Sequence, residues 1–278
     1  MNLFKTTILL TGLTLILVLA GEYFGGTDGA LLAFAVAATM NFFSYFYSDK
    51  IALRMYRAQP VTRDELPRVY AVVERLTGRA GIPMPKIYVI PTESPNAFAT
   101  GRNPNHASVA VTHGILALLT DDELEGVLAH ELGHVRNRDI LTSSIAATLA
   151  GAITILARMA FWFGGRRRGG IGTLLMLLLA PLAAMLIQLW VSRTREYEAD
   201  TSGAHLTGNP YALASALEKI SGMSRRIPLA ASANSAHMFI IAPLLSGQSF
   251  ASLFSTHPPV QKRIERLIGR PSMNGSIQ

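Results

Sequence analysis

The run His130-Glu131-Leu132-Gly133-His134 is the most informative part of this chain. It is a His-Glu-x-x-His run, and residues four apart on a helix lie one above the other on the same face. His130 and His134 can therefore both direct an imidazole nitrogen at one Zn²⁺, while Glu131 reaches the water on that ion as general base. The run predicts a helix that carries a zinc hydrolase site. Two histidines on a solvated helix face are the alternative interpretation.

The residues around this run predict a well-defined helix. Thr120-Asp121-Asp122-Glu123 has the pattern of a capping box, and acidic residues at that end also suit the helix dipole. An apolar stripe at helical spacing follows, formed by Leu124, Val127, Leu128, Leu132 and Val135. A helix that starts firmly and faces a core gives the histidines the rigid support that a metal site needs.

Zinc in a hydrolytic site takes three protein ligands and keeps one position open for water. The metzincin pattern is excluded, because Asn137 and Ile140 occupy the positions where it needs glycine and histidine. The third ligand must therefore come from elsewhere in the chain.

A carboxylate pair at helical spacing lies downstream, in the segment 192–200. Glu196 and Asp200 share one helix face, so Glu196 can bind zinc while Asp200 accepts a hydrogen bond from a ligating histidine. Glu198 points roughly the opposite way and is the weaker candidate. A solvated charged helix is the alternative interpretation of this segment.

The composition predicts a membrane protein independently, because 50% of the residues are hydrophobic and only 15% are charged. Four apolar runs approach the length that a helix needs to cross a bilayer, at 6–20, 29–47, 142–163 and 171–191. We therefore expect two transmembrane helices in residues 1–48, a peptidase domain split between 49–140 and 192–278, and a transmembrane helix pair or hairpin in 141–191.

The basic residues predict the orientation in the membrane. The loop between the first two runs has no lysine or arginine, whereas Lys50, Arg54 and Arg57 follow the second run, so the active site should face the cytoplasm. The arginines of the segment 164–170 then lie on the outer side, which leaves open whether 141–191 crosses completely. The N-terminus also has the look of a signal peptide, but the second span after a short loop favours an uncleaved anchor.

The charge and cysteine content narrow the function classes further. The net charge of +7 comes from basic residues scattered beside the apolar runs, a distribution that suits lipid head groups and excludes nucleic acid as a partner. The absence of cysteine excludes disulfides and thiolate metal ligands.

Short strands are predicted at 86–90 and 108–112, and the stretch 96–101 between them can form an edge strand. An edge strand has free backbone groups to which an extended peptide can add. An ordinary sheet strand is the alternative. The chain as a whole is expected to be mainly α with a small β-sheet.

The His-Glu-Leu-Gly-His run at 130–134, followed by Glu-Tyr-x-Ala-Asp at 196–200, resembles the integral-membrane zinc endopeptidases of the HtpX type, relatives of the CAAX prenyl proteases. The resemblance extends to Asn96-Ala97-Phe98-Ala99 and Thr256-His257-Pro258-Pro259. It implies a polytopic membrane protein with a zincin-like (gluzincin) catalytic domain. It also implies one Zn²⁺ held by His130, His134 and Glu196, with Glu131 as catalytic base.

The same resemblance implies further roles. Asn96, Ala97 and Phe98 would bind the substrate, and His257 would donate a hydrogen bond near the active site, to the tetrahedral oxyanion. The expected function is cleavage of misfolded or damaged membrane proteins in quality control of a bacterial inner membrane. A CAAX-type processing protease is the nearer alternative, and a non-enzymatic metal-binding membrane scaffold is the farther one.

Overall fold

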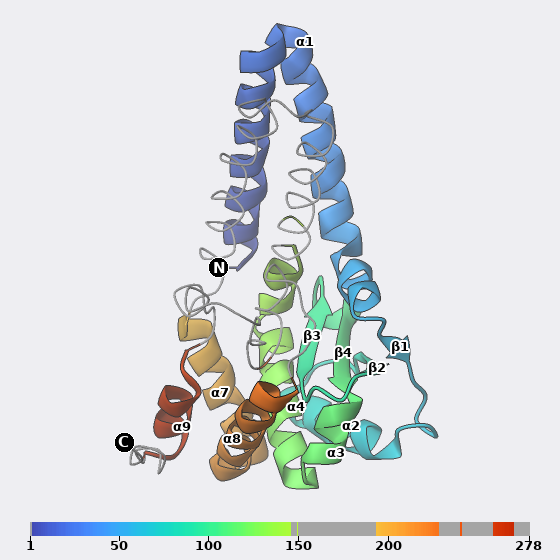
Figure 1. Cartoon of the computed structure of the whole chain (residues 1–278), viewed down its shortest axis with the longest axis vertical. Helices are drawn as coiled ribbons and strands as arrows, with labels where there is room; N and C mark the ends of the chain where they lie inside the picture. Colours follow the sequence, from blue (N-terminus) through green and yellow to red (C-terminus); the bar gives the residue numbers. More distant parts are fainter. Residues whose placement is uncertain (1, 146–148, 150–192, 228–239, 241–257, 270–278) are drawn as a thin grey trace.

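The computed structural model describes residues 2–145, 149, 193–227, 240 and 258–269. A long helical hairpin stands on a domain of helices and one sheet (Figure 1). Most of the two apolar runs predicted at 142–163 and 171–191 lies outside the described residues, and so does His257.

The hairpin is α1, Asn2–Met55, which is kinked at Gly26. Gly26 has a φ of 59°, in the left-handed region that favours glycine, and the two arms run back along each other from this point (Figure 1). The arms are joined by a polar contact, because the Asn41 side-chain amide donates to the Thr14 hydroxyl at 2.9 Å.

The second arm of the hairpin has the character of a membrane span. Of the helices in the described part of the chain, Gly25–Met55 is the one that is long and apolar enough to cross a bilayer by length and composition. A shorter apolar helix, Leu10–Tyr23, lies in the first arm. Large apolar side chains are exposed along the second arm, among them Leu31, Leu32, Phe34, Phe42 and Phe43.

The sheet has four strands in the order β1-β2-β4-β3, with β2 and β4 parallel and the outer pairs antiparallel. Within the described residues β3 is therefore an edge strand, as the sequence allowed. The strands are β1 (Gln59–Pro60), β2 (Lys86–Ile90), β3 (Ala97–Gly101) and β4 (Ala107–Thr112), with a 3₁₀ turn at Pro104–His106.

Helix α4 lies at the centre of the domain, between the sheet on one side and helices α7 and α8 on the other (Figure 1). It begins with the predicted capping box, in which Thr120 and Glu123 exchange hydrogen bonds between side chain and backbone. The helices of the domain are α2 (Pro67–Ala80), α3 (His113–Leu118), α4 (Asp121–Arg136), α7 (Arg193–Thr207), α8 (Pro210–Arg226) and α9 (Val260–Ile268).

Small residues let α7 approach α4 closely. A Cβ atom on Gly203 of α7 would lie 2.9 Å from the His130 backbone nitrogen, nearer than such atoms normally come. Gly133 of α4 likewise faces Ala199, with 3.5 Å between its ideal Cβ position and the Ala199 Cα. This close packing places the side chains of the two helices within reach of one metal ion.

The foot of α1 is fixed to the sheet by an apolar cluster. The rings of Tyr56 on the chain after α1 and Phe98 on β3 lie 5.8 Å apart between centroids. Phe98 is fully buried there, together with Ala52, Leu53, Ile90 and Ala110. The hairpin and the strand next to the site are therefore mechanically connected.

Candidate metal centre

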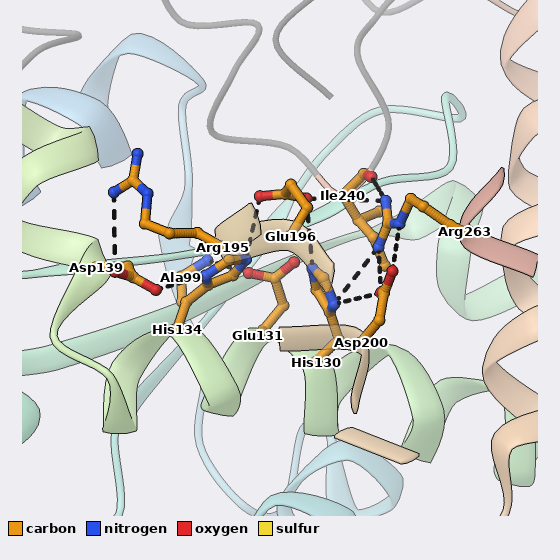
Figure 2. Close-up of polar contacts among 10 residues, drawn as sticks. All are labelled: Ala99, His130, Glu131, His134, Asp139, Arg195, Glu196, Asp200, Ile240 and Arg263. Carbon is orange, nitrogen blue, oxygen red and sulfur yellow. Dashed lines mark hydrogen bonds and ion pairs between the residues drawn. The ribbon is translucent and has the colours of Figure 1, made fainter. Parts of the chain in front are cut away.

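Helices α4 and α7 bring three potential metal ligands together (Figure 2). The ligand atoms of His130, His134 and Glu196 all lie within 4.8 Å of one another. The His134 Nε2 atom is 3.5 Å from one Glu196 oxygen, and the His130 Nε2 atom is 3.9 Å from the other. Tetrahedral zinc with bonds of about 2.0–2.1 Å holds its ligand atoms roughly 3.4 Å apart, so the cluster fits zinc after a small contraction.

Each histidine uses its other ring nitrogen to contact a carboxylate. The Nδ1 atom of His130 is 2.9 Å from Asp200, and the Nδ1 atom of His134 is 3.3 Å from Asp139. Both Nε2 atoms are therefore directed towards Glu196, as in metal sites where a carboxylate orients the ligating imidazole. The contact of Asp200 with a histidine had been predicted from the sequence, whereas that of Asp139 had not.

Glu131 lies between the three-residue cluster and the edge strand. Its side chain is buried, and its Oε2 atom accepts a hydrogen bond of 2.9 Å from the Ala99 amide of β3. Burial, and next the neighbouring charge of Glu196, raise the pKa of Glu131 to about 8. Glu131 is thus held at a point where a base could reach both the metal position and a peptide on β3.

The free edge of β3 presents backbone groups of Ala97 and Ala99, because hydrogen bonding to β4 alternates along an antiparallel strand. These two residues have four such groups, two amides and two carbonyls, and three of the four form hydrogen bonds with other groups of the chain. The Ala97 carbonyl accepts from the Ile240 amide at 3.2 Å, and the Ala97 amide donates to the Asn96 side chain at 3.1 Å. Glu131 holds the Ala99 amide. The fourth group is the Ala99 carbonyl, which accepts no hydrogen bond at this edge from the described part of the chain.

The two histidines have opposite electrostatic surroundings. Burial, and next the charge of Arg263, lower the pKa of His130 to about 4. Burial also acts to lower the pKa of His134, but the hydrogen bond with Asp139 and the charges of Glu196 and Glu131 outweigh it and raise that pKa to about 9. The carboxylates around His134 thus favour positive charge at this position, which a divalent cation would also supply.

The predicted site residues are distributed as follows. Ala97 and Phe98 lie on β3, and Asn96 precedes it. The Phe98 side chain packs against the foot of α1 and does not reach the free edge of β3. The backbone groups of its neighbours Ala97 and Ala99 do. Glu198 on α7 is exposed, in contrast to the buried Glu196 and Asp200. The role expected for His257 concerns a residue outside the described part of the chain and stays a prediction.

Known peptidases are similar to this chain over most of its length. The model of peptidase family M48 matches residues 63–270. A protein named "Protease HtpX homolog" from Desulfatibacillum aliphaticivorans is 54% identical over 286 residues, covering 99% of this chain and 92% of that protein. One of the same name from Persephonella marina is 52% identical over 289 residues, covering 100% of each. Another, from Thermococcus sibiricus, is 54% identical over 275 residues, covering 95% of this chain and 94% of its own length.

A solved structure also matches. The crystal structure of Ste24p from S. mikatae has a TM-score of 0.53 and 21% sequence identity, over 96% of this chain and 65% of that protein. This chain thus spans just under two thirds of Ste24p. At that identity the likeness shows a common fold.

Proposed function

This chain belongs to peptidase family M48 and is a zinc metalloprotease, and from this we propose that it is a membrane-bound endopeptidase whose zinc is held by His130, His134 and Glu196. The observation that supports the ligand assignment most is the approach of these three side chains to within 4.8 Å, with a carboxylate behind each imidazole. Two imidazoles and one carboxylate are a ligand set that suits zinc.

The proposed mechanism assigns the proton transfers to Glu131. When bound, zinc supplies a Lewis acid that polarises the scissile carbonyl and lowers the pKa of water. Glu131 would take a proton from the attacking water and deliver it to the leaving nitrogen. The burial that raises the pKa of this carboxyl favours its holding a proton between these two steps.

The substrate would bind as an added strand at the free edge of β3. Backbone pairing of this kind holds a peptide extended and makes few demands on its side chains. A peptide that pairs with β3 would take over the Ala97 carbonyl from Ile240 and the Ala99 amide from Glu131. In this proposal substrate binding itself frees the Glu131 carboxylate to act as base. Asn96 and the buried Phe98 keep the strand in place.

We further propose that His257 donates a hydrogen bond to the oxyanion that forms on the scissile carbonyl. In the sequence His257 stands three residues before the start of α9. Helix α9 carries Arg263 into the site, which supports a site contribution from this part of the chain.

The proposed location is the inner membrane of a bacterium-like cell. The apolar hairpin of α1 and the apolar runs of 141–191 would span the bilayer, and the split domain 49–140 and 192–278 would face the cytoplasm. A catalytic site attached to a membrane in this way suits substrates that are themselves membrane proteins. We therefore propose misfolded or damaged membrane proteins as substrates, in membrane quality control.

The test is cleavage of an unfolded protein by the detergent-purified enzyme, both metal-free and zinc-loaded. We expect cleavage to require zinc and to fall at least about 100-fold in Glu131→Gln, the scale of a lost general base. Asp122→Asn, which changes an exposed carboxylate in the first turn of the same helix, serves as the matched control and should cleave normally.

Cleavage that persists in Glu131→Gln or without metal would contradict this proposal. Zinc binding without cleavage of any unfolded substrate would instead favour the CAAX-type processing alternative or the metal-binding scaffold.

A further inference from the structure

Arg263 on α9 is among the largest fully buried side chains in the described part of the chain, with a relative exposure of 0%. Removing a guanidinium from water costs several kcal/mol, and an apolar side chain of similar volume often serves stability as well or better. A buried arginine beside a catalytic site therefore calls for a reason other than stability.

Arg263 contacts two carboxylates (Figure 2): it pairs closely with Asp200, and its Nη1 atom lies 3.9 Å from the Glu196 Oε2 atom. Its Nε and Nη2 atoms donate to the two oxygens of Asp200 at 2.8 and 2.7 Å, which is a bidentate pair. Its Nη1 atom donates to the Ile240 carbonyl at 2.7 Å. With three of its nitrogens engaged, the guanidinium plane is fixed, and the Asp200 carboxylate cannot rotate.

The fixed carboxylate in turn determines how His130 lies. Asp200 can only accept hydrogen bonds, so the His130 Nδ1 atom 2.9 Å away must be the donor. The direct approach of Arg263 to the same nitrogen is longer, at 3.4 Å, and would bring two donors together. Arg263 therefore influences His130 through Asp200, and the result is a free lone pair on the Nε2 atom that faces Glu196.

The second histidine has a weaker version of the same arrangement. His134 contacts Asp139 at 3.3 Å, and Arg195 lies 3.8 Å from the other Asp139 oxygen, with 14% of its side chain exposed. An arginine behind the carboxylate thus occurs at both imidazoles, but only Arg263 is fully buried and bidentate.

We propose that Arg263 is a positioning residue that holds Asp200, and through it the metal-binding imidazole of His130, in the orientation needed for zinc. This inference rests on the proposed ligand set. It assigns α9, which supplies no ligand among the described residues, a direct part in building the site. Arginine is suited to this task because its planar fork grips both carboxylate oxygens, which a lysine cannot do.

The test compares the zinc affinity of Arg263→Gln and Arg263→Lys with the wild type, by competition with a chelator. We expect Arg263→Gln to bind zinc roughly 10- to 100-fold more weakly, the usual scale for losing a partner that orients a ligand. Arg263→Lys, which keeps the charge, should recover only part of this loss. The visible absorption of the Co²⁺-substituted variants should change, because the geometry at His130 changes.

The matched control is Arg266→Gln on the same helix. Arg266 packs over the Tyr197 ring of α7 at 4.0 Å, so its loss weakens the docking of α9 without touching Asp200. We expect this variant to keep wild-type zinc affinity and an unchanged Co²⁺ spectrum.

A double variant tests whether Arg263 acts through Asp200. If it does, the double variant Arg263→Gln with Asp200→Asn will lose much less zinc affinity than the two single fold-losses multiplied together. Zinc affinity and Co²⁺ spectra do not depend on cleavage, so a failure here is distinct from a failure of the proposed activity. Wild-type affinity in both Arg263 variants, an effect no larger than that of Arg266→Gln, or additive losses would overturn the proposal. If Arg263→Gln does not fold, Arg263→Lys decides by the same criteria.

Discussion

The Glu123 carboxylate connects the start of α4 to α8 through hydrogen bonds. It accepts hydrogen bonds from the Thr120 amide at 2.9 Å, the Ser215 hydroxyl at 2.6 Å and the Lys219 ammonium at 2.8 Å. Burial acts to raise the pKa of Glu123, but the contacts with Lys219 and Ser215 outweigh it and lower that pKa from 4.5 to about 2. The charged form of Glu123 is therefore favoured in the folded protein.

This shift predicts how stability depends on pH. Because the folded-state pKa lies below the unfolded one, Glu123 contributes its full stability above about pH 4.5 and loses it as the pH falls towards 2. We expect Glu123→Gln to lower the free energy of unfolding at pH 7, on the order of 2 kcal/mol. The difference from the wild type should shrink below pH 4.5. Thermal unfolding in detergent across pH 3–7 measures it, and a difference independent of pH would contradict this origin.

At the scale of residues, the helical spacing in the sequence indicates which of the clustered side chains share a helix face. Helical spacing alone relates His130 to His134 and Glu196 to Asp200. The contact of Asp139 with His134 is not predictable from the sequence, because α4 ends at Arg136 and the chain then turns back through Arg138. No residue pattern indicates the φ of 59° at Arg138. The sequence does contain a signal for the burial of Arg263. This residue occupies a place in the apolar stripe of α9, beside Val260, Ile264 and Leu267.

At the scale of elements, the site depends on how closely α7 packs on α4. Gly203 allows that approach, since a methyl group in its place would meet backbone atoms of His130 that cannot move aside. The distance between the two helices in turn sets the distance from Glu196 to the histidines.

We therefore expect Gly203→Ala to separate α7 from α4, to weaken zinc binding at least about ten-fold and to destabilise the fold by about 1–3 kcal/mol, the usual cost of overpacking. Gly222→Ala on α8 is the matched control, because nothing lies within 4 Å of its added Cβ. That variant should be neutral or slightly stabilising, since alanine favours helix. Zinc titration and thermal unfolding measure both variants. Equal zinc affinity and equal stability of the two variants would show that zinc binding does not need the close approach of α7 to α4.

The elements themselves were largely readable from the sequence. The capping box and the strands near 86–90 and 108–112 follow from local patterns, and the structure confirms them. The order of strands does not follow from such patterns. That β3 lies at the edge depends on β2 pairing directly with β4, a contact between segments that are distant in the chain.

At the scale of the whole molecule, the foot of the α1 hairpin and the catalytic domain share an apolar cluster that includes Ala52, Leu53, Tyr56 and Phe98. Phe98 belongs to the strand at whose edge we place the substrate. The proposed membrane anchor and the proposed substrate strand therefore share a core, which no local pattern in the sequence could reveal.

The proposed orientation predicts which parts of the chain can be labelled from outside the cell. The chain has no cysteine, so a single introduced thiol reports without background. We expect a membrane-impermeant maleimide to label Asp28→Cys, near the tip of the hairpin, in cells whose outer membrane has been removed. Asp64→Cys, exposed on the catalytic domain, should react only after lysis. The reverse pattern would place the active site outside the cytoplasm.

The third zinc ligand is tested by the zinc content of two purified variants whose substituted residues lie two positions apart on α7. Glu196 is buried and faces the two histidines, whereas Glu198 is exposed. We expect one zinc per chain in the wild type and in Glu198→Gln, and loss of most of it in Glu196→Gln. Full zinc content in Glu196→Gln, or its loss in Glu198→Gln, would contradict the assignment of the third ligand and with it the proposed site.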